Sequence, residues 1–256
     1  MQNIYSNEFK AEVSKALDTK TYLGLGNPSS KILVVGKEVS TDLEENQNYI
    51  LEEQNLYNYN KNALDWDDNI KKNISQKCIE NWIFNDPNKI NNPIFAFKGA
   101  LIKEEGKTWR KYQKLHDNIF KRKFFSNERF GHNFQERFFI TEMSDAPSKT
   151  TGKALQRKNF KRELENRKNT FLKSNFIQNF PVVILACNDY ITGNEIEEIF
   201  TVNFCEQKGN GNQLFWTHYN TVKTKLVIHT RQLSTNVSNN LISEIAEVIR
   251  YMLKLK

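Results

Sequence analysis

Three side chains that could carry acid–base or electrostatic chemistry follow short apolar runs of the sequence. Glu38 is the second residue after the run KILVVG, Glu142 directly follows RFFIT, and His229 ends KLVIH. A carboxylate can stabilise developing positive charge and orient an attacking water, whereas an imidazole can donate a hydrogen bond to a departing anion. Whether the three act together depends on the fold, because they are separated by 87 residues or more.

Polar residues that could hold a ligand stand next to these three positions. Gly36 and Lys37 precede Glu38, Asn188 follows the run VVILAC, and Arg231 lies two residues after His229. We expect chemistry from Glu38 and His229. We expect substrate binding from Gly36, Lys37, Glu142, Asn188, Arg231, Gln232, Leu233 and Ser234.

Four apolar runs of strand length must position these residues. They are rich in β-branched side chains and do not alternate with polar residues, which is typical of parallel strands that are buried on both faces. Ligand sites of parallel sheets form beyond the carboxyl ends of the strands, which is where the candidate residues stand. The four predicted strands are Lys31–Gly36, Arg137–Thr141, Val182–Cys187 and Lys225–His229.

Segments with a helical period lie between and after these runs. Lys107–Phe120 places Trp109 and Tyr112 on one side, where we expect core packing rather than stacking on a base, and Asn240–Leu253 has a similar apolar face. Alternating strands and helices predict an α/β fold, a three-layer α/β/α sandwich around a central, mainly parallel, four-stranded sheet. We expect residues 1–256 to form one domain.

Two segments do not fit the simple alternation. Residues from about Ser40 to Asn92 are acidic and rich in Asn, which indicates an insertion after the first strand, partly helical from Ile70 to Phe84 and anchored by Trp66 and Trp82. Ile199–Phe204 and Gln213–Tyr219 flank a glycine-containing turn, which predicts a hairpin.

Charge is unevenly distributed along the chain. The net charge is +7, and the segment Lys149–Lys173 alone holds nine Lys or Arg against two Glu. Such a segment attracts a polyanion, although it could also be a solvated helical face. The residues that we expect to bind nucleic acid are Lys153, Arg157, Lys158, Lys161 and Arg162.

Several classes of protein do not fit the sequence. No apolar run is long enough to span a bilayer, and charges interrupt the N-terminal segment where a signal peptide is apolar, so we expect a cytosolic protein without membrane contact. Cys78, Cys187 and Cys205 have no CxxC spacing and the histidines are scattered, so we expect no disulfide, no metal and no cofactor. Walker, GxSxG and dinucleotide-binding patterns are absent.

The strand-end segments, taken in order, resemble the motifs of the uracil-DNA glycosylase superfamily. The family's first motif, of the type GQDPY, corresponds to Gly36–Ser40, and its HPSPLS-like motif corresponds to His229–Ser234. The resemblance covers roughly Thr21–Glu38 and Lys107–Lys256. The prolines of both motifs are missing, and Glu142 stands where the family usually has an Asn that binds the edge of the base.

The resemblance implies a role for each matching residue. Glu38 would orient water, His229 would stabilise the departing base, and Leu233 would fill the space that a flipped base leaves in DNA. An ionised Glu142 only accepts hydrogen bonds, so it would suit a base edge rich in amino donors rather than uracil. We therefore expect a metal-independent DNA glycosylase-like hydrolase that acts as a monomer on a nucleic acid, DNA rather than RNA.

Two other hypotheses remain open at this point. The same fold could be a nucleic-acid or nucleotide binding module without catalytic activity, since the motifs depart from the family pattern. Alternatively, the acidic insertion could bind a basic protein. For single residues, Glu38 could be a loop carboxylate in a surface salt bridge, and His229 could be a structural residue.

Overall fold

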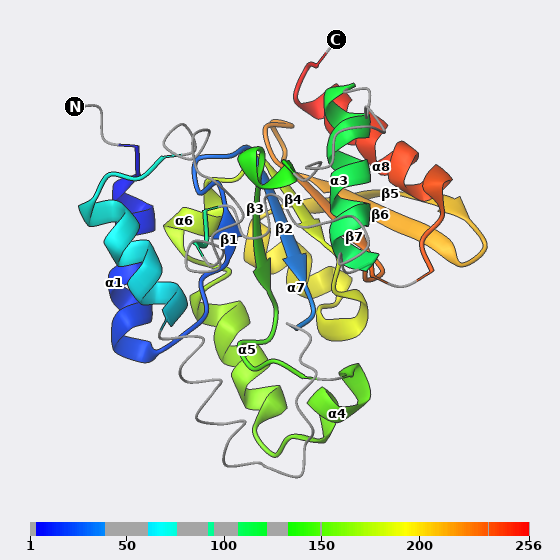
Figure 1. Ribbon diagram of the computed structural model, residues 1–256. Coiled ribbons are helices and arrows are strands. Elements are labelled where there is room, and N and C mark those ends of the chain that lie inside the picture. Colours follow the sequence, from blue (N-terminus) through cyan, green and yellow to red (C-terminus); the bar gives the residue numbers. More distant parts are fainter. Residues whose placement is uncertain are drawn as a thin grey trace.

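The computed structural model is described here for residues 4–38, 61–75, 92–94, 107–121, 133–148, 150–234 and 236–255. In these ranges, seven strands form one mixed sheet in the order β1-β3-β2-β4-β7-β6-β5. The protein has an α/β fold, with helices packed against the sheet (Figure 1). The strands are β1 Leu25–Gly26, β2 Ile32–Gly36, β3 Phe138–Glu142, β4 Val182–Leu185, β5 Asn203–Asn210, β6 Gln213–Tyr219 and β7 Leu226–Thr230.

All four predicted strands are present, as β2, β3, β4 and β7, and they are parallel neighbours in the sheet. The prediction of four strands in total was wrong. The predicted hairpin forms β5 and β6, which extend the sheet antiparallel beyond β7, although Ile199 and Phe200 belong to the preceding helix. The third additional strand, β1, has only two residues, too few to show a sequence pattern.

Five of the described α-helices are preceded by a residue whose side chain caps them. Ser6, Thr150, Ser174, Thr192 and Ser238 each accept a hydrogen bond from a backbone N–H of the first turn, which satisfies a donor that the helix itself cannot. The α-helices are α1 Asn7–Thr19, α3 Lys107–Phe120, α4 Thr151–Gln156, α5 Phe160–Thr170, α6 Asn175–Gln178, α7 Gly193–Phe200 and α8 Asn239–Met252; two short 3-10 helices are η3 Phe134–Glu136 and η4 Asn188–Tyr190.

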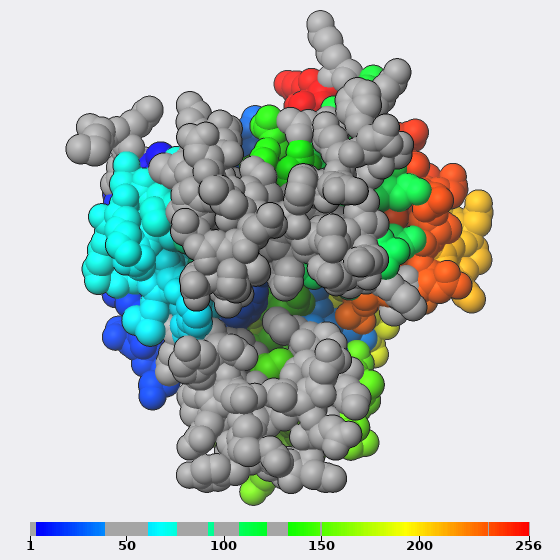
Figure 2. All heavy atoms as spheres, viewed as in Figure 1, coloured from blue at the N-terminus to red at the C-terminus, as the bar shows by residue number. Residues whose placement is uncertain are grey.

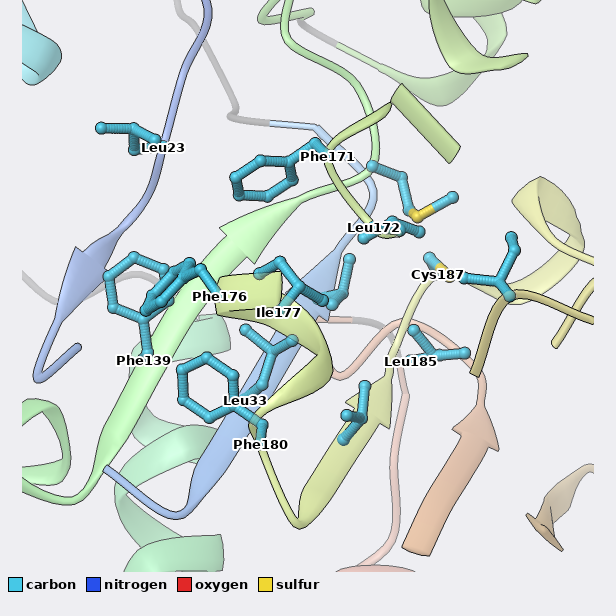
Figure 3. Close-up of a cluster of buried hydrophobic side chains, with 14 of the residues drawn as sticks. Leu23, Leu33, Phe139, Phe171, Leu172, Phe176, Ile177, Phe180, Leu185 and Cys187 are labelled. Carbon is cyan, nitrogen blue, oxygen red and sulfur yellow. The ribbon is translucent and has the colours of Figure 1, made fainter. Parts of the chain in front are cut away.

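The alternating side chains of the central strands contribute to two separate core clusters. Leu33 and Val35 of β2 pack in a cluster with residues of α1, α5, α6 and α7, whereas Ile32 and Val34 pack in a cluster with residues of α3 and α8. Figure 3 shows part of the first cluster, in which α6 and Phe180 lie over β2, β3 and β4. In Figure 2, α1 and α8 lie on opposite flanks of the molecule.

Only part of the acidic insertion lies within the described residues. Residues 61–71 are helical, and Trp66 is fully buried with its indole N–H donating to the Gly24 carbonyl at 2.9 Å. Trp66 therefore anchors this segment to the core, as predicted. The predicted helix, Ile70 to Phe84, was placed too late in the chain, because the observed helical residues end at 71. The part of the predicted helix from residue 76 onward, including Trp82, lies outside the described residues.

Two findings bear on the class of protein. Of the residues that the structure describes, none belong to a helix long and apolar enough to cross a membrane. Cys187 is buried and Cys205 is exposed, and both are free thiols, whereas Cys78 lies outside the described residues.

Candidate functional site

The chain connections diverge between β2 and β4, and open α/β sheets form a crevice at the carboxyl ends of two such strands. The chain passes from β2 to β3 on one side, then crosses back to β4 and continues to β7 on the other. Ligands of open α/β sheets bind at such a switch point, because the connections after the two strands diverge there. Gly36–Glu38 follows β2 and Ala186–Asn188 follows β4, so both predicted segments line this crevice.

Lys37 joins the two loops of the crevice. Its ammonium lies 3.3 Å from the Asp189 carboxylate and 4.7 Å from the centre of the Tyr190 ring. Lys37 is only 7% exposed, whereas the Asp189 side chain is 74% exposed. Lys37 therefore pairs with Asp189.

Glu38 is held by two hydroxyl groups. Tyr190 donates to Oε2 at 2.6 Å and Thr151, the first residue of α4, donates to Oε1 at 2.9 Å. Burial and this carboxylate both raise the pKa of Tyr190, so the phenol keeps its proton and remains a donor. Glu38 is 9% exposed, which excludes the alternative of an exposed loop carboxylate in a surface salt bridge.

Glu142 lies at the end of β3, opposite Gly36 in the parallel pairing. Its carboxyl group occupies the space above Gly36, where a β-carbon would overlap with Oε2. Burial and the nearby Glu38 carboxylate raise the pKa of Glu142 to about 8, whereas the Arg167 guanidinium acts in the opposite direction. Glu142 is therefore mainly protonated at neutral pH, and a carboxylic acid can donate as well as accept. The expectation of an ionised Glu142 is corrected accordingly.

Arg167 fixes the backbone that carries Glu142. Its guanidinium donates to the Glu142 carbonyl at 2.7 Å and to the Thr141 hydroxyl at 2.8 Å, and it forms an ion pair with Asp145. Arg167 is 2% exposed, so these bonds are shielded from water. Asp145 thus has a structural role as a partner of Arg167.

His229 lies beside Leu185 on the neighbouring strand, and its ring packs against Trp216 with the ring centres 5.5 Å apart. Its Nε2 is 2.8 Å from the Asn188 carbonyl oxygen, which can only accept, so Nε2 carries the proton. Burial lowers the pKa of His229, although the hydrogen bond to Asn188 and the Asp189 carboxylate raise it. The imidazole is neutral at pH 7, and its Nε2 donor is already engaged.

A pocket of about 360 Å³ opens beside these residues. Four predicted substrate-binding residues line it together with four residues of the β5–β6 hairpin that the sequence had not indicated as site residues. The predicted ones are Lys37, Asn188, Arg231 and Gln232, and the others are Gly211, Asn212, Leu214 and Trp216. The hairpin was visible in the sequence, but its place next to β7 became apparent only from the order of the strands.

The remaining predicted residues do not line this pocket. Gly36, Glu38, Glu142 and His229 lie at the same edge of the sheet but outside the pocket lining. Leu233 is 1% exposed and packs in the core cluster beneath α8, so it is not available as a side chain that enters DNA, and we do not retain that role. Ser234 is partly exposed and does not contribute to the lining.

The basic segment forms α4 and α5, toward which the carboxyl ends of β2 and β3 point (Figure 1). Arg167, Lys168 and Lys173 of this segment form ion pairs with Asp145, Glu195 and Glu198. Lys158, Lys161 and Arg162 are exposed. The other two predicted residues, Lys153 and Arg157, are half-buried, and Arg157 donates to the Ser144 hydroxyl at 2.9 Å.

Among the described residues, no group of three or more His, Cys, Asp or Glu side chains is arranged to hold a metal ion. The chain matches no family model, and it matches neither a curated protein nor a solved structure.

Proposed function

We propose that this protein binds nucleic acid and that the pocket beside β7 holds one nucleotide unit of it. The observation that carries the proposal is the composition of the lining, in which the cations Lys37 and Arg231 and the indole of Trp216 occur without an acidic residue. The volume of about 360 Å³ falls in the range of small-molecule sites. DNA is the expected nucleic acid, as inferred from the resemblance described above.

Arg231 is the side chain best suited to a phosphate. One of its terminal nitrogens donates to the Asn212 carbonyl at 2.9 Å, which fixes the guanidinium at the rim of the pocket. A guanidinium has five N–H donors in a planar fork that matches phosphate oxygens, so a backbone contact and a phosphate contact are compatible. Trp216 offers an aromatic face, on which a base of any sequence can stack.

The exposed basic residues of α4 and α5 supply a second region for the phosphate backbone. Thr151 of α4 is bonded to Glu38, so α4 lies at the same edge of the sheet as the crevice. Lys158, Lys161 and Arg162 would contribute affinity through release of counterions, without dependence on sequence. The pocket and this basic surface together support binding of a polymer rather than of a free nucleotide alone.

We further propose that the fold is a three-layer α/β/α sandwich of the uracil-DNA glycosylase type. The four adjacent parallel strands and the two core clusters, which involve different helices, support this assignment. Glu142 and the proline-free loop after His229 depart from the motifs of that superfamily, so under this proposal the chain is a divergent member of it.

Binding can be tested with a labelled oligonucleotide and the variant Arg231→Gln. We expect a several-fold weaker affinity, because a phosphate contact is lost, while Lys31→Gln at the opposite edge of the sheet leaves affinity unchanged. Thermal unfolding of both variants shows whether the fold is intact. Equal affinity of the wild-type protein and Arg231→Gln would contradict the placement of phosphate at this pocket.

Hydrolysis of an N-glycosidic bond is the second candidate function. It is favoured by one specific observation: Glu38, Glu142 and His229 all lie at the carboxyl edge of the parallel strands. It ranks second because both Glu38 oxygens and the His229 Nε2 are already hydrogen-bonded within the protein. Under this proposal Glu38 orients water and a protonated Glu142 binds the edge of the base.

The test for hydrolysis is an assay for abasic sites in DNA that contains uracil, hypoxanthine, xanthine or alkylated bases. If the protein is a glycosylase, one of these substrates yields abasic product, and Glu38→Gln reduces the yield by a factor of about 100 or more. Absence of product with every substrate at high protein concentration would remove this candidate and leave the binding proposal unaffected.

A further inference from the structure

A row of aromatic rings leads from the edge of the sheet to the pocket. Phe204 of β5 is opposite His218 of β6, with ring centres 5.7 Å apart, and Trp216 of β6 is opposite His229 of β7, with ring centres 5.5 Å apart. Directly opposite residues and residues two apart in a strand share one face of a sheet. The four rings therefore lie on the same face of β5, β6 and β7.

The two ends of this row differ in exposure. The Phe204 side chain is 53% exposed at the edge strand, whereas Trp216 is partly buried and lines the pocket. Gln207 accepts a hydrogen bond from the Trp216 indole N–H at 3.1 Å, which fixes the plane of the ring. A ring held in this way is a preorganised surface on which a planar base can stack.

Among the residues that the structure describes, the apolar side chains that line the pocket, Leu214 and Trp216, are only partly exposed, so neither is placed to replace a base extruded from a duplex. Within the described ranges, the large apolar side chains that are exposed do not line the pocket; they are Leu64, Leu155, Phe204, Val222 and Tyr251. Leu233, which follows β7 near the rim, is buried in the core. Extrusion of a base costs a few kcal/mol, and the cost is least where the base is already unpaired.

We propose that the pocket selects an unpaired nucleotide, so that the substrate of this protein is a single-stranded nucleic acid rather than a duplex. The inference rests on the proposed function and specifies its substrate class. The base stacks on Trp216, Arg231 binds the adjacent phosphate, and the neighbouring nucleotide of the strand reaches the exposed ring of Phe204. A paired base cannot reach the indole, because its faces are covered by the adjacent base pairs.

The experiment compares three probes: a single-stranded oligonucleotide, the duplex that contains the same strand, and a mononucleotide with one of its bases. We expect the single strand to bind at least about 10-fold more tightly than the duplex, since stacking on an aromatic ring contributes roughly that factor or more per base. DNA and RNA single strands are measured separately, and preferential binding of either over its own duplex supports the proposal.

Two variants test the path of the strand. Trp216→Leu is expected to weaken single-strand binding by about 10-fold. Phe204→Ser is expected to weaken strand binding but not mononucleotide binding, because its ring lies outside the pocket lining. Tyr251→Ser is the matched control, as Tyr251 is 84% exposed on α8, and it should change nothing. If Trp216→Leu lowers the unfolding temperature, Phe204→Ser alone decides whether the strand contacts this face.

The outcomes separate the inference from the proposed function. Equal affinity for duplex and single strand would overturn the inference while nucleic-acid binding stands. Binding of the mononucleotide without tighter binding of the strand would also overturn it. Absence of binding to every probe would instead refute the proposed function itself.

Discussion

At the scale of single residues, two acidic groups outside the pocket lining, Glu38 and Glu142, lie close together at the carboxyl edge of the parallel strands. Glu38 is bonded to two hydroxyl groups, and Glu142 lies above Gly36 with its pKa raised. Two neighbouring carboxylates repel each other, so the more strongly desolvated one retains its proton. The consequence is a protonated Glu142, which can donate a hydrogen bond where the sequence had suggested an acceptor only.

This proton has a measurable effect on stability. Because burial raises the pKa of Glu142 from 4.5 to about 8, the folded chain holds a proton between these values that the unfolded chain has lost. The free energy of unfolding should therefore fall as pH rises from about 5 to 8 and level off above. In Glu142→Gln this fall should be smaller, by roughly 3–4 kcal/mol, because each unit of a raised pKa corresponds to about 1.4 kcal/mol and glutamine does not ionise.

Urea denaturation at several pH values measures this difference. Glu247→Gln serves as the control, since Glu247 is exposed on α8 and should leave the pH dependence as it is in the wild type. If the free energy of unfolding changes between pH 5 and 8 to the same extent in the wild-type protein and in Glu142→Gln, the pKa of Glu142 is not raised by folding.

At the scale of elements, the close approach of β2 and β3 depends on a residue without a side chain. Gly36 and Glu142 are partners in the parallel register, and the Glu142 carboxyl group fills the space that a β-carbon of residue 36 would need. A glycine at the end of a strand is therefore required here by packing. The sequence showed the glycine, but its neighbour across the sheet is more than a hundred residues away.

Replacement of this glycine tests the packing. Gly36→Ala is expected to lower the free energy of unfolding by about 2 kcal/mol, the usual cost of overpacking a filled site. The double variant Gly36→Ala with Glu142→Ala should recover most of that loss, because the carboxyl group is then absent. Gly193→Ala is the matched control: nothing lies within 4 Å of the added β-carbon at the start of α7, so stability should be unchanged or slightly higher. Equal losses in both single variants would contradict the explanation.

At the scale of the whole molecule, the excess of positive charge is concentrated in one segment of the chain. The segment that forms α4 and α5 holds much of it, and internal ion pairs engage Arg167, Lys168 and Lys173 there. The exposed Lys158, Lys161 and Arg162 remain for an external partner at the carboxyl edge of the parallel strands. The proposed binding of nucleic acid should accordingly depend on this surface and not on net charge alone.

The salt dependence of binding distinguishes local charge from net charge. Replacement of Lys158, Lys161 and Arg162 by Gln should reduce the slope of log affinity against log salt concentration by about 2, as each contact with a single strand contributes roughly 0.7. A control variant with Lys15, Lys31 and Lys223 replaced by Gln loses the same charge from exposed positions elsewhere. Equal slopes for the two variants would mean that the basic segment has no specific part in binding.

The sequence by itself determined the four parallel strands, the helices α3 and α8 and the strand-end positions of Lys37, Asn188 and Arg231. Short apolar runs and helical periods are local patterns, and the carboxyl ends of parallel strands necessarily share one edge. Tertiary structure alone decided the order of the strands, and with it the approach of the β5–β6 hairpin and Trp216 to the pocket. It also decided the burial of Leu233 and the protonation of Glu142, because solvent exposure and pKa depend on neighbours that are distant in the chain.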